Sequence, residues 1–209
     1  LADAGEADVR VQTTLDEAAR ARFGFSTGSS LSGPVPIKIS GKVSDNKDVR
    51  LQIDADLTPA KVENLLPGWT KPSGRSNRAS FVLVTRDKAT RFENLVIDGS
   101  GANVRGNIEL DGAGDLVSAN FPVFALSDGD KTSLKAERSP DGVLKVAMRG
   151  DVYDGRGFVK AFFGGEQTEK PKADTLDLDL DIRLGAIAGH NGEALRGVDL
   201  KMTKRNGQI

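Results

Sequence analysis

Ser26 and His190 are the residues whose types would suit nucleophilic catalysis. The run Gly24-Phe25-Ser26-Thr27-Gly28 matches the G-x-S-x-G pattern of a nucleophile elbow, which requires a strand before the serine and a helix after it. Here the pattern predicts a helix before Ser26 and a Ser/Gly-rich loop after it. His190 is the one histidine, and it lies in Gly189-His190-Asn191-Gly192, a stretch typical of a hairpin turn. The sequence therefore predicts no catalytic residue and no enzyme, with Ser26 and His190 far apart.

Aspartates recur in two stretches that could suggest calcium. A calcium loop wraps its oxygen ligands around a point and uses a glycine to bend the chain. Here the carboxylates alternate with apolar residues, which spreads them along one face of a strand. We therefore expect no metal site, and we expect solvent exposure for Asp54, Asp56, Asp177, Asp179 and Asp181.

Other site chemistries find little support. The chain has no cysteine, which excludes disulfides, zinc–thiolate sites and cysteine nucleophiles. Gly99-Ser100-Gly101 lacks the strand–helix context of a phosphate loop. A carboxylate pair for glycoside hydrolysis stays possible, because strands can bring any two carboxylates together, but aromatic residues make up only 5% of the chain. The sequence predicts no bound cofactor.

Charge and hydropathy exclude further classes. The 29 basic and 30 acidic residues give a net charge of −1, without the basic excess of a nucleic-acid-binding protein. No window approaches the ~18 consecutive apolar residues of a membrane helix, and no signal peptide opens the chain. Leu1 is not a start methionine, and Asn206-Gly207 reads as a hairpin turn entering a further strand. We expect the chain to be a piece of a larger protein.

Period-two alternation dominates the chain and predicts β-strands. Tight-turn sequences such as Asp98-Gly99-Ser100-Gly101 and Pro140-Asp141-Gly142 separate many of these runs at hairpin spacing. No helix-length pattern interrupts the meander, so parallel crossovers are not expected. The expected strands are 8–13, 35–43, 49–57, 79–86, 92–98, 102–110, 116–121, 123–126, 131–137, 143–149, 176–182 and 197–204.

Three short helices are expected among these strands. The first spans Leu15–Phe23, with Thr14 and Glu17 as a capping box. The second spans Pro59–Leu65, with Thr58 as its N-cap. The third spans Asp154–Phe163 and ends at Gly164-Gly165. The predicted fold class is thus mostly β, with two or three short helices.

A charged segment that contains a proline is expected to divide the chain into two parts. Residues 166–174 are charged, contain Pro171 and read as a linker. We expect 1–165 to form an antiparallel β segment with short helices, and 175–209 to begin a further, truncated β segment.

Two strands have especially regular apolar faces, which are the candidate binding residues of this chain: Val49, Leu51, Ile53, Ala55, Leu57, Leu176, Leu178, Leu180 and Ile182. Such a face must be buried, either against a second sheet or against a ligand. Alternation is identical in the two cases, so both stay open at this point.

Five segments of the chain carry a resemblance to a known family. The likeness covers about Leu15 to Ile209, and turn and strand patterns carry it. They are Leu31-Ser32-Gly33-Pro34-Val35-Pro36-Ile37, the run from Ile53-Asp54-Ala55-Asp56-Leu57-Thr58-Pro59-Ala60 to Leu66-Pro67-Gly68-Trp69-Thr70-Lys71-Pro72, Asp98-Gly99-Ser100-Gly101-Ala102-Asn103-Val104-Arg105-Gly106, Gly150-Asp151-Val152-Tyr153-Asp154-Gly155-Arg156-Gly157 and Gly192-Glu193-Ala194-Leu195-Arg196-Gly197-Val198-Asp199-Leu200. These segments resemble the AsmA-like envelope proteins, including the YhdP- and TamB-type members of Gram-negative bacteria.

The resemblance implies a long, curved β-sheet that forms a groove with an apolar inner face. It implies a periplasmic segment of a protein anchored in the inner membrane, with the anchor outside this segment. The implied role is non-enzymatic movement of phospholipid between inner and outer membranes, in support of outer-membrane homeostasis. The implied partners are phospholipid acyl chains and adjoining β segments of the same parent chain. The alternative is a β-sandwich or β-solenoid module that binds protein or glycan in adhesion or as a scaffold.

Overall fold

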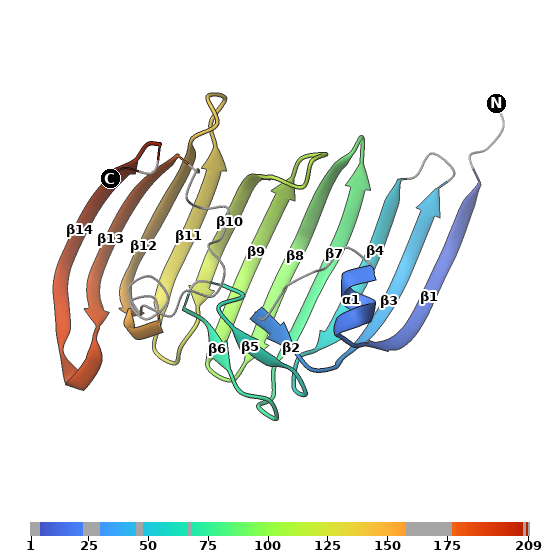
Figure 1. Ribbon diagram of the computed structural model, residues 1–209, viewed down its shortest axis with the longest axis horizontal. Coiled ribbons are helices and arrows are strands. Elements are labelled where there is room, and N and C mark those ends of the chain that lie inside the picture. The colour runs from blue at the N-terminus through green and yellow to red at the C-terminus, as the bar shows by residue number, and fades with distance from the viewer. Residues whose placement is uncertain are drawn as a thin grey trace.

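The computed structural model describes residues 5–22, 30–44, 48–66, 68–157, 177–206 and 208. One sheet of eleven strands, mostly antiparallel, dominates this part of the chain (Figure 1). In spatial order its strands are β1 (Glu6–Leu15), β3 (Val35–Ser44), β4 (Val49–Asp56), β7 (Arg78–Arg86), β8 (Ala89–Gly99), β9 (Ala102–Leu110), β10 (Leu116–Ala125), β11 (Lys131–Arg138), β12 (Leu144–Asp154), β13 (Leu178–Ala188) and β14 (Ala194–Lys204).

The predicted mostly-β class and the meander are confirmed from β3 to β12. Consecutive strands of the sheet pair antiparallel there, and tight turns join most of them. At the β8–β9 turn, Ser100 has a φ of 50° and Gly101 a φ of 82°, the left-handed conformations that two-residue hairpin loops require. The turn predicted at Asp98-Gly99-Ser100-Gly101 is therefore confirmed.

Two details of the strand prediction are wrong. Residues 116–121 and 123–126 are not two strands but one, β10, with a register irregularity between Asn120 and Val123. An irregularity interrupts the alternation without ending the pairing. The expectation that no strands pair in parallel is also wrong, because β12 pairs with β13 in parallel over Leu144–Asp154.

A second, three-stranded sheet lies against one face of the large one. It consists of β2 (Leu31–Ser32), β5 (Lys61–Glu63) and β6 (Thr70–Lys71), in the order β2-β5-β6. The expected helix at Pro59–Leu65 is therefore wrong. A helix this short is unstable by itself, whereas Val62 gains full burial when β5 pairs with β2 and β6.

The first expected helix is present in shortened form as α1 (Glu17–Arg22). Its N-cap is Asp16, whose Oδ1 accepts a 2.7 Å hydrogen bond from the Ala19 amide. Thr14 is not the cap, because it belongs to β1 and pairs with Pro36 of β3. A short 3₁₀ turn, η3 (His190–Gly192), joins β13 to β14, as expected for a hairpin there.

Two expectations fall largely outside the described residues. The third helix at Asp154–Phe163 is described only to Gly157, and Asp154 itself ends β12. The linker at 166–174 lies wholly outside, so the division into two units stays a prediction. What the structure does show is that β13 and β14 belong to the same sheet as β12.

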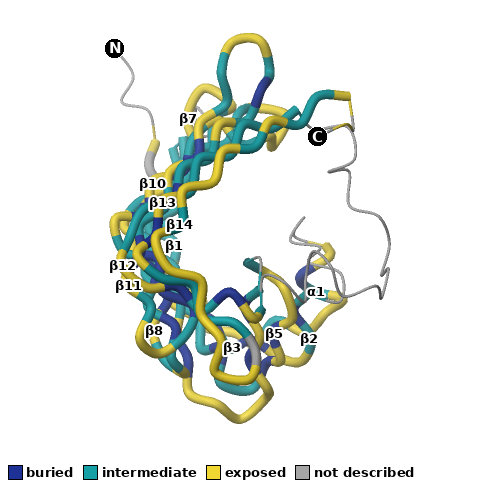
Figure 2. The backbone as a smooth tube through the Cα atoms, turned by 90° about the vertical axis from the view of Figure 1, so that its left-hand side faces the viewer, coloured by how far each residue is buried: buried dark blue, intermediate teal, exposed yellow. Residues whose placement is uncertain are grey.

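The large sheet is strongly curved. Seen along the sheet, its strands follow a C-shaped arc, and β2, β5 and α1 lie inside the lower part of that arc (Figure 2). The small sheet therefore covers part of the concave face. We call the part that contains Val35, Ile97 and Val104 the covered half, and the part that contains Val43, Val49 and Leu110 the open half.

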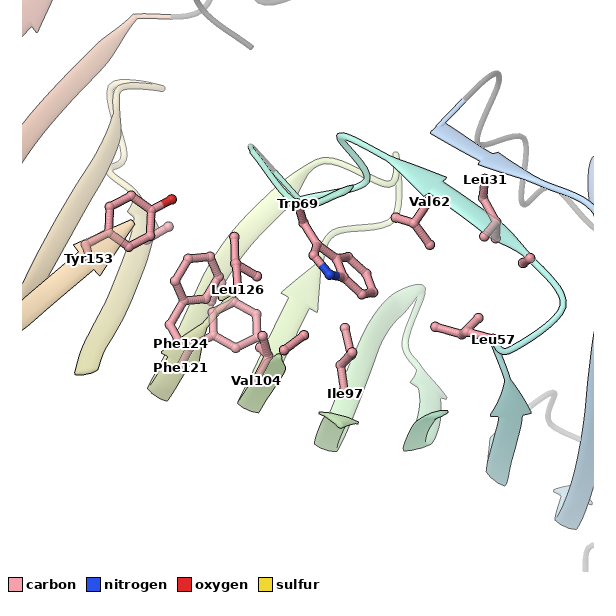
Figure 3. Packing of buried hydrophobic residues seen from close by; sticks show 14 of the residues in the cluster. Leu31, Leu57, Val62, Trp69, Ile97, Val104, Phe121, Phe124, Leu126 and Tyr153 are labelled. Atoms are coloured by element: carbon pink, nitrogen blue, oxygen red, sulfur yellow. The ribbon is translucent and has the colours of Figure 1, made fainter. Parts of the chain in front are cut away.

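The core lies between the small sheet and the covered half. Leu31, Val62 and Trp69 face side chains of the large sheet such as Ile97 and Val104 (Figure 3). Trp69 is 1% exposed, and Val62 and Val104 are fully buried. At the end of this core, burial, with Asp130 and Asp154 nearby, raises the pKa of Tyr153 to about 12.

Candidate lipid-binding face

A continuous row of ten apolar residues and one glycine crosses all eleven strands on the concave face. Strand pairing places the members directly opposite one another, so they share a face. We call this set the central row: Val9, Gly41, Leu51, Leu83, Phe92, Ile108, Ala119, Ala136, Val146, Leu180 and Met202.

The central row is only partly covered. Ala119 and Ala136 are buried, while its other members are half-buried. The next row toward the open half begins with Val43, Val49 and Thr85 and is half-buried as well. The rows of the covered half differ, since Val35, Ile97 and Val104 are buried. The apolar surface thus continues past the edge of the small sheet.

The convex face carries a row of opposite character. Each of its members is the sequence neighbour of a central-row residue, and pairing again joins them across the sheet. This outer row contains Asp8, Lys42, Arg50, Val84, Arg91, Glu109, Ser118, Glu137, Lys145, Asp179 and Thr203. Val84 is its one apolar residue. Along these two rows, the sheet is therefore mainly polar on its convex face and apolar on its concave face.

Ion pairs on the convex face connect adjacent strands in one case and strands separated by β7 in the other. Arg91 of β8 lies 3.0 Å from Glu109 of β9, and Arg50 of β4 lies 3.0 Å from Glu93 of β8. Both pairs are largely exposed, where an ion pair contributes little to stability. Their main effect is to make this face compatible with water.

Two buried cations anchor the small sheet beside the concave face. The guanidinium of Arg20 donates to the carbonyl oxygens of Leu31 at 2.8 Å and Gly33 at 2.7 Å, which ties α1 to β2. The Lys71 Nζ donates to the carbonyl oxygens of Ala60, Pro72 and Arg75 at 2.7, 3.0 and 3.2 Å. Burial lowers the pKa of Lys71, and Asp56 partly opposes this.

The residues singled out in the sequence fall into three groups. Val49, Leu51, Ile53 and Ala55 lie half-buried on the concave face of β4, and Leu178, Leu180 and Ile182 lie half-buried on the concave face of β13. Leu57 instead lies in the core, 5% exposed, beneath the small sheet. Leu176 lies outside the described residues. The pairing of the intervening strands places the two sets on one surface.

Sequence reasoning did not single out the members of this surface between β4 and β13. Leu83, Phe92, Ile108 and Val146 complete the central row there. Their strands were predicted, and the same period-two alternation marks their apolar faces. The missing information was the pairing that aligns those faces into one row.

The expected exposure of the aspartates is confirmed only for Asp54. Asp56, Asp177, Asp179 and Asp181 are half-buried, because neighbouring groups bind them. Asp56 accepts a 2.9 Å hydrogen bond from the Thr58 amide, and hydrogen bonds from Thr58 lower the pKa of Asp56. Asp179 pairs with Arg205 at 2.8 Å. These carboxylates thus belong to the polar convex face or lie at the ends of its strands, where neighbouring groups bind them.

The sequence offers Ser26 and His190 as candidates for catalysis and its aspartates as candidates for metal binding. Ser26 lies outside the described residues, as does the side chain of His190, so their separation stays a prediction. Within the described ranges, no three or more His, Asp or Glu side chains gather as metal ligands. No helix there has the length and apolar character needed to cross a membrane.

Comparisons of the chain with protein-family models, with curated proteins and with solved structures found no match. The candidate site therefore stands on its own geometry, which is a wide concave sheet with an apolar inner surface that is half covered.

Proposed function

We propose that the central row and the open half of the concave face bind phospholipid acyl chains, as one segment of a non-enzymatic lipid pathway. The observation that carries this proposal is the central row, which stays apolar or glycine across eleven strands although most of its members are incompletely buried. An apolar surface of this extent is normally an interaction site.

The chemistry of the row suits acyl chains. Aliphatic and aromatic side chains offer burial, at about 0.8 kcal/mol per CH₂ group, without directional bonds that would hold a lipid in one place. Eleven strands at ~4.8 Å spacing span on the order of 50 Å, more than the ~30 Å hydrocarbon core of a bilayer. A surface of this width accommodates an acyl chain at successive positions.

The resemblance to AsmA-like envelope proteins supports the cellular setting. We propose that the chain is a periplasmic segment of an inner-membrane-anchored protein of a Gram-negative bacterium, and that its pathway moves phospholipid between the two membranes. The single curved sheet is consistent with the groove that this resemblance implies. The alternative sandwich would need a second sheet of comparable size. In the described residues, the second sheet has only three short strands.

Photocrosslinking tests the proposal with a matched control on one strand. A photoreactive amino acid replaces Leu51, which belongs to the central row, or Gln52, which faces the convex side. After irradiation in cells, we expect phospholipid on the protein labelled at position 51 and not at position 52. Equal capture at both positions, or capture at 51 of protein groups alone, would refute the proposal.

A charge on the central row provides a second measurement. We expect Leu51→Asp to abolish co-purification of lipid from a detergent-free preparation, while Gln52→Asp retains it. Circular dichroism and the Tm establish that each variant is folded. Retention of lipid by a folded Leu51→Asp variant would contradict binding at this row.

A further inference from the structure

Strand β14 forms one margin of the large sheet. Strand β13 pairs with it on one side, and among the described residues no strand of the sheet lies on its other side. Two of its apolar residues are strongly exposed, Leu195 at 68% and Leu200 at 44%. An edge with unpaired main-chain groups and exposed apolar side chains is a template for strand addition.

The chain reverses direction immediately after β14. Asn206 has a φ of 50°, and Gln208 returns antiparallel to Arg205. The Arg205 amide donates to the Gln208 carbonyl at 2.8 Å, and the Gln208 amide donates to the Arg205 carbonyl at 2.9 Å. This mutual pair is the first hydrogen-bonded rung of a hairpin with a two-residue loop.

The rung determines which main-chain groups of β14 face outward. Main-chain N–H and C=O groups alternate between the two sides of a strand. Because those of Arg205 point to the side of Gln208, those of Thr203, Lys201 and Asp199 point to the same margin. Gly197, with a φ of 63°, bends the strand and ends this regular edge.

We propose that this margin of β14 binds a further antiparallel β-strand, in the register that the Arg205–Gln208 rung begins. The strand carries apolar residues opposite Val198, Leu200 and Met202, which face the concave side. It carries polar residues opposite Asp199, Lys201 and Thr203, which face the convex side. The central row, which reaches β14 at Met202, then continues onto the added strand.

The choice of occupant follows from the two faces of β14. A wholly polar strand would leave Leu200 exposed on one side. A wholly apolar strand would place apolar side chains beside the charged groups of Lys201 and of Asp199, which pairs with Arg183 at 3.6 Å. An alternating strand satisfies both faces, and a shift of one residue would reverse every side chain. The proposal does not depend on what the concave face binds.

Two fusions of equal composition test the proposal. Each appends an alternating apolar/polar strand after the last residue of the chain. In one fusion the apolar residues stand opposite Val198, Leu200 and Met202, and in the other the strand is shifted by one residue. Hydrogen exchange of the Lys201 and Thr203 amides is measured without lipid, after size exclusion has established that each fusion is monomeric.

We expect the in-phase strand to slow exchange of these two amides at least tenfold and to raise the Tm, and the shifted strand to do neither. A further variant, Lys201→Pro, removes one outward amide, a change that edge strands tolerate. We expect it to abolish the Tm gain of the in-phase fusion. Equal protection by both fusions, or no protection by either, would overturn the proposal.

Discussion

Arg149 of β12 and Asp181 of β13 join the two parallel strands of the sheet on its convex face. Their side chains form an ion pair, with Nη2 and Oδ2 2.6 Å apart, and Arg149 Nη1 also donates to the Asp181 carbonyl oxygen at 2.6 Å. The residues are 32 positions apart in sequence. Parallel strands cannot be joined by a tight turn, so this contact helps to define their register.

This contact predicts a pH-dependent contribution to stability. The hydrogen bond from Arg149 holds the pKa of Asp181 below its usual value. Because the folded-state pKa is lowered, the contribution is complete above the unfolded pKa of about 4 and is lost as the pH falls through the folded value. We expect Asp181→Asn to lower the Tm at pH 7 and to match the unmodified protein at the acidic limit.

Thermal unfolding between pH 7 and pH 2 measures this difference. Asp54→Asn is the control, because Asp54 is exposed on the same face, and we expect it to change the free energy of unfolding by no more than about 0.5 kcal/mol. A difference between Asp181→Asn and the unmodified protein that persists at the lowest pH would contradict the assigned role.

Removal of the buried ammonium of Lys71 should destabilise the small sheet. Lys71→Met keeps most of the side-chain volume but leaves the carbonyl oxygens of Ala60, Pro72 and Arg75 without their common donor. We expect a loss of about 2–3 kcal/mol in the free energy of unfolding, measured with urea. Lys61→Met, at a position with 51% side-chain exposure, should cost less than about 0.5 kcal/mol. Equal losses would show that Lys71 is not an anchor.

The same substitution should cost more stability in the covered half of the concave face than in the open half. Val104 is fully buried under the small sheet, whereas Val49 of the open half is half-buried. We expect Val104→Ala to cost about 2 kcal/mol because it leaves a cavity, and Val49→Ala to cost about 1 kcal/mol or less. Chemical denaturation without lipid measures both. A larger loss at Val49 would mean that the open half is packed as a core.

Gly106 of β9 is required by the packing of β10. A Cβ atom at this position would lie 2.1 Å from the Asn120 carbonyl oxygen and 2.6 Å from the Phe121 ring. We expect Gly106→Ala to cost about 3 kcal/mol or to displace Phe121. Gly114→Ala is the control: its φ is 85° but it has open space around it, so we expect about 1–2 kcal/mol. Thermal unfolding compares the two variants.

The alternation of residues in the sequence was sufficient to predict most of the strands and the character of their faces. The sequence alone indicates that Leu51 and Leu180 belong to apolar faces, because side chains alternate along a strand whatever its neighbours are. Turn sequences likewise located most of the joints, since φ values such as those of Ser100 and Gly101 depend on local residue types.

Only the tertiary structure decided how these strands are combined. The conversion of 59–65 from an expected helix into β5, the parallel pairing of β12 with β13 and the alignment of Leu51 with Leu180 in one row all depend on contacts between distant residues. The burial of Leu57, in contrast to the partial exposure of Leu51, depends on where the small sheet lies. Alternation is a property of one strand, whereas pairing, curvature and coverage arise from the free energy of surfaces that meet only in the folded chain.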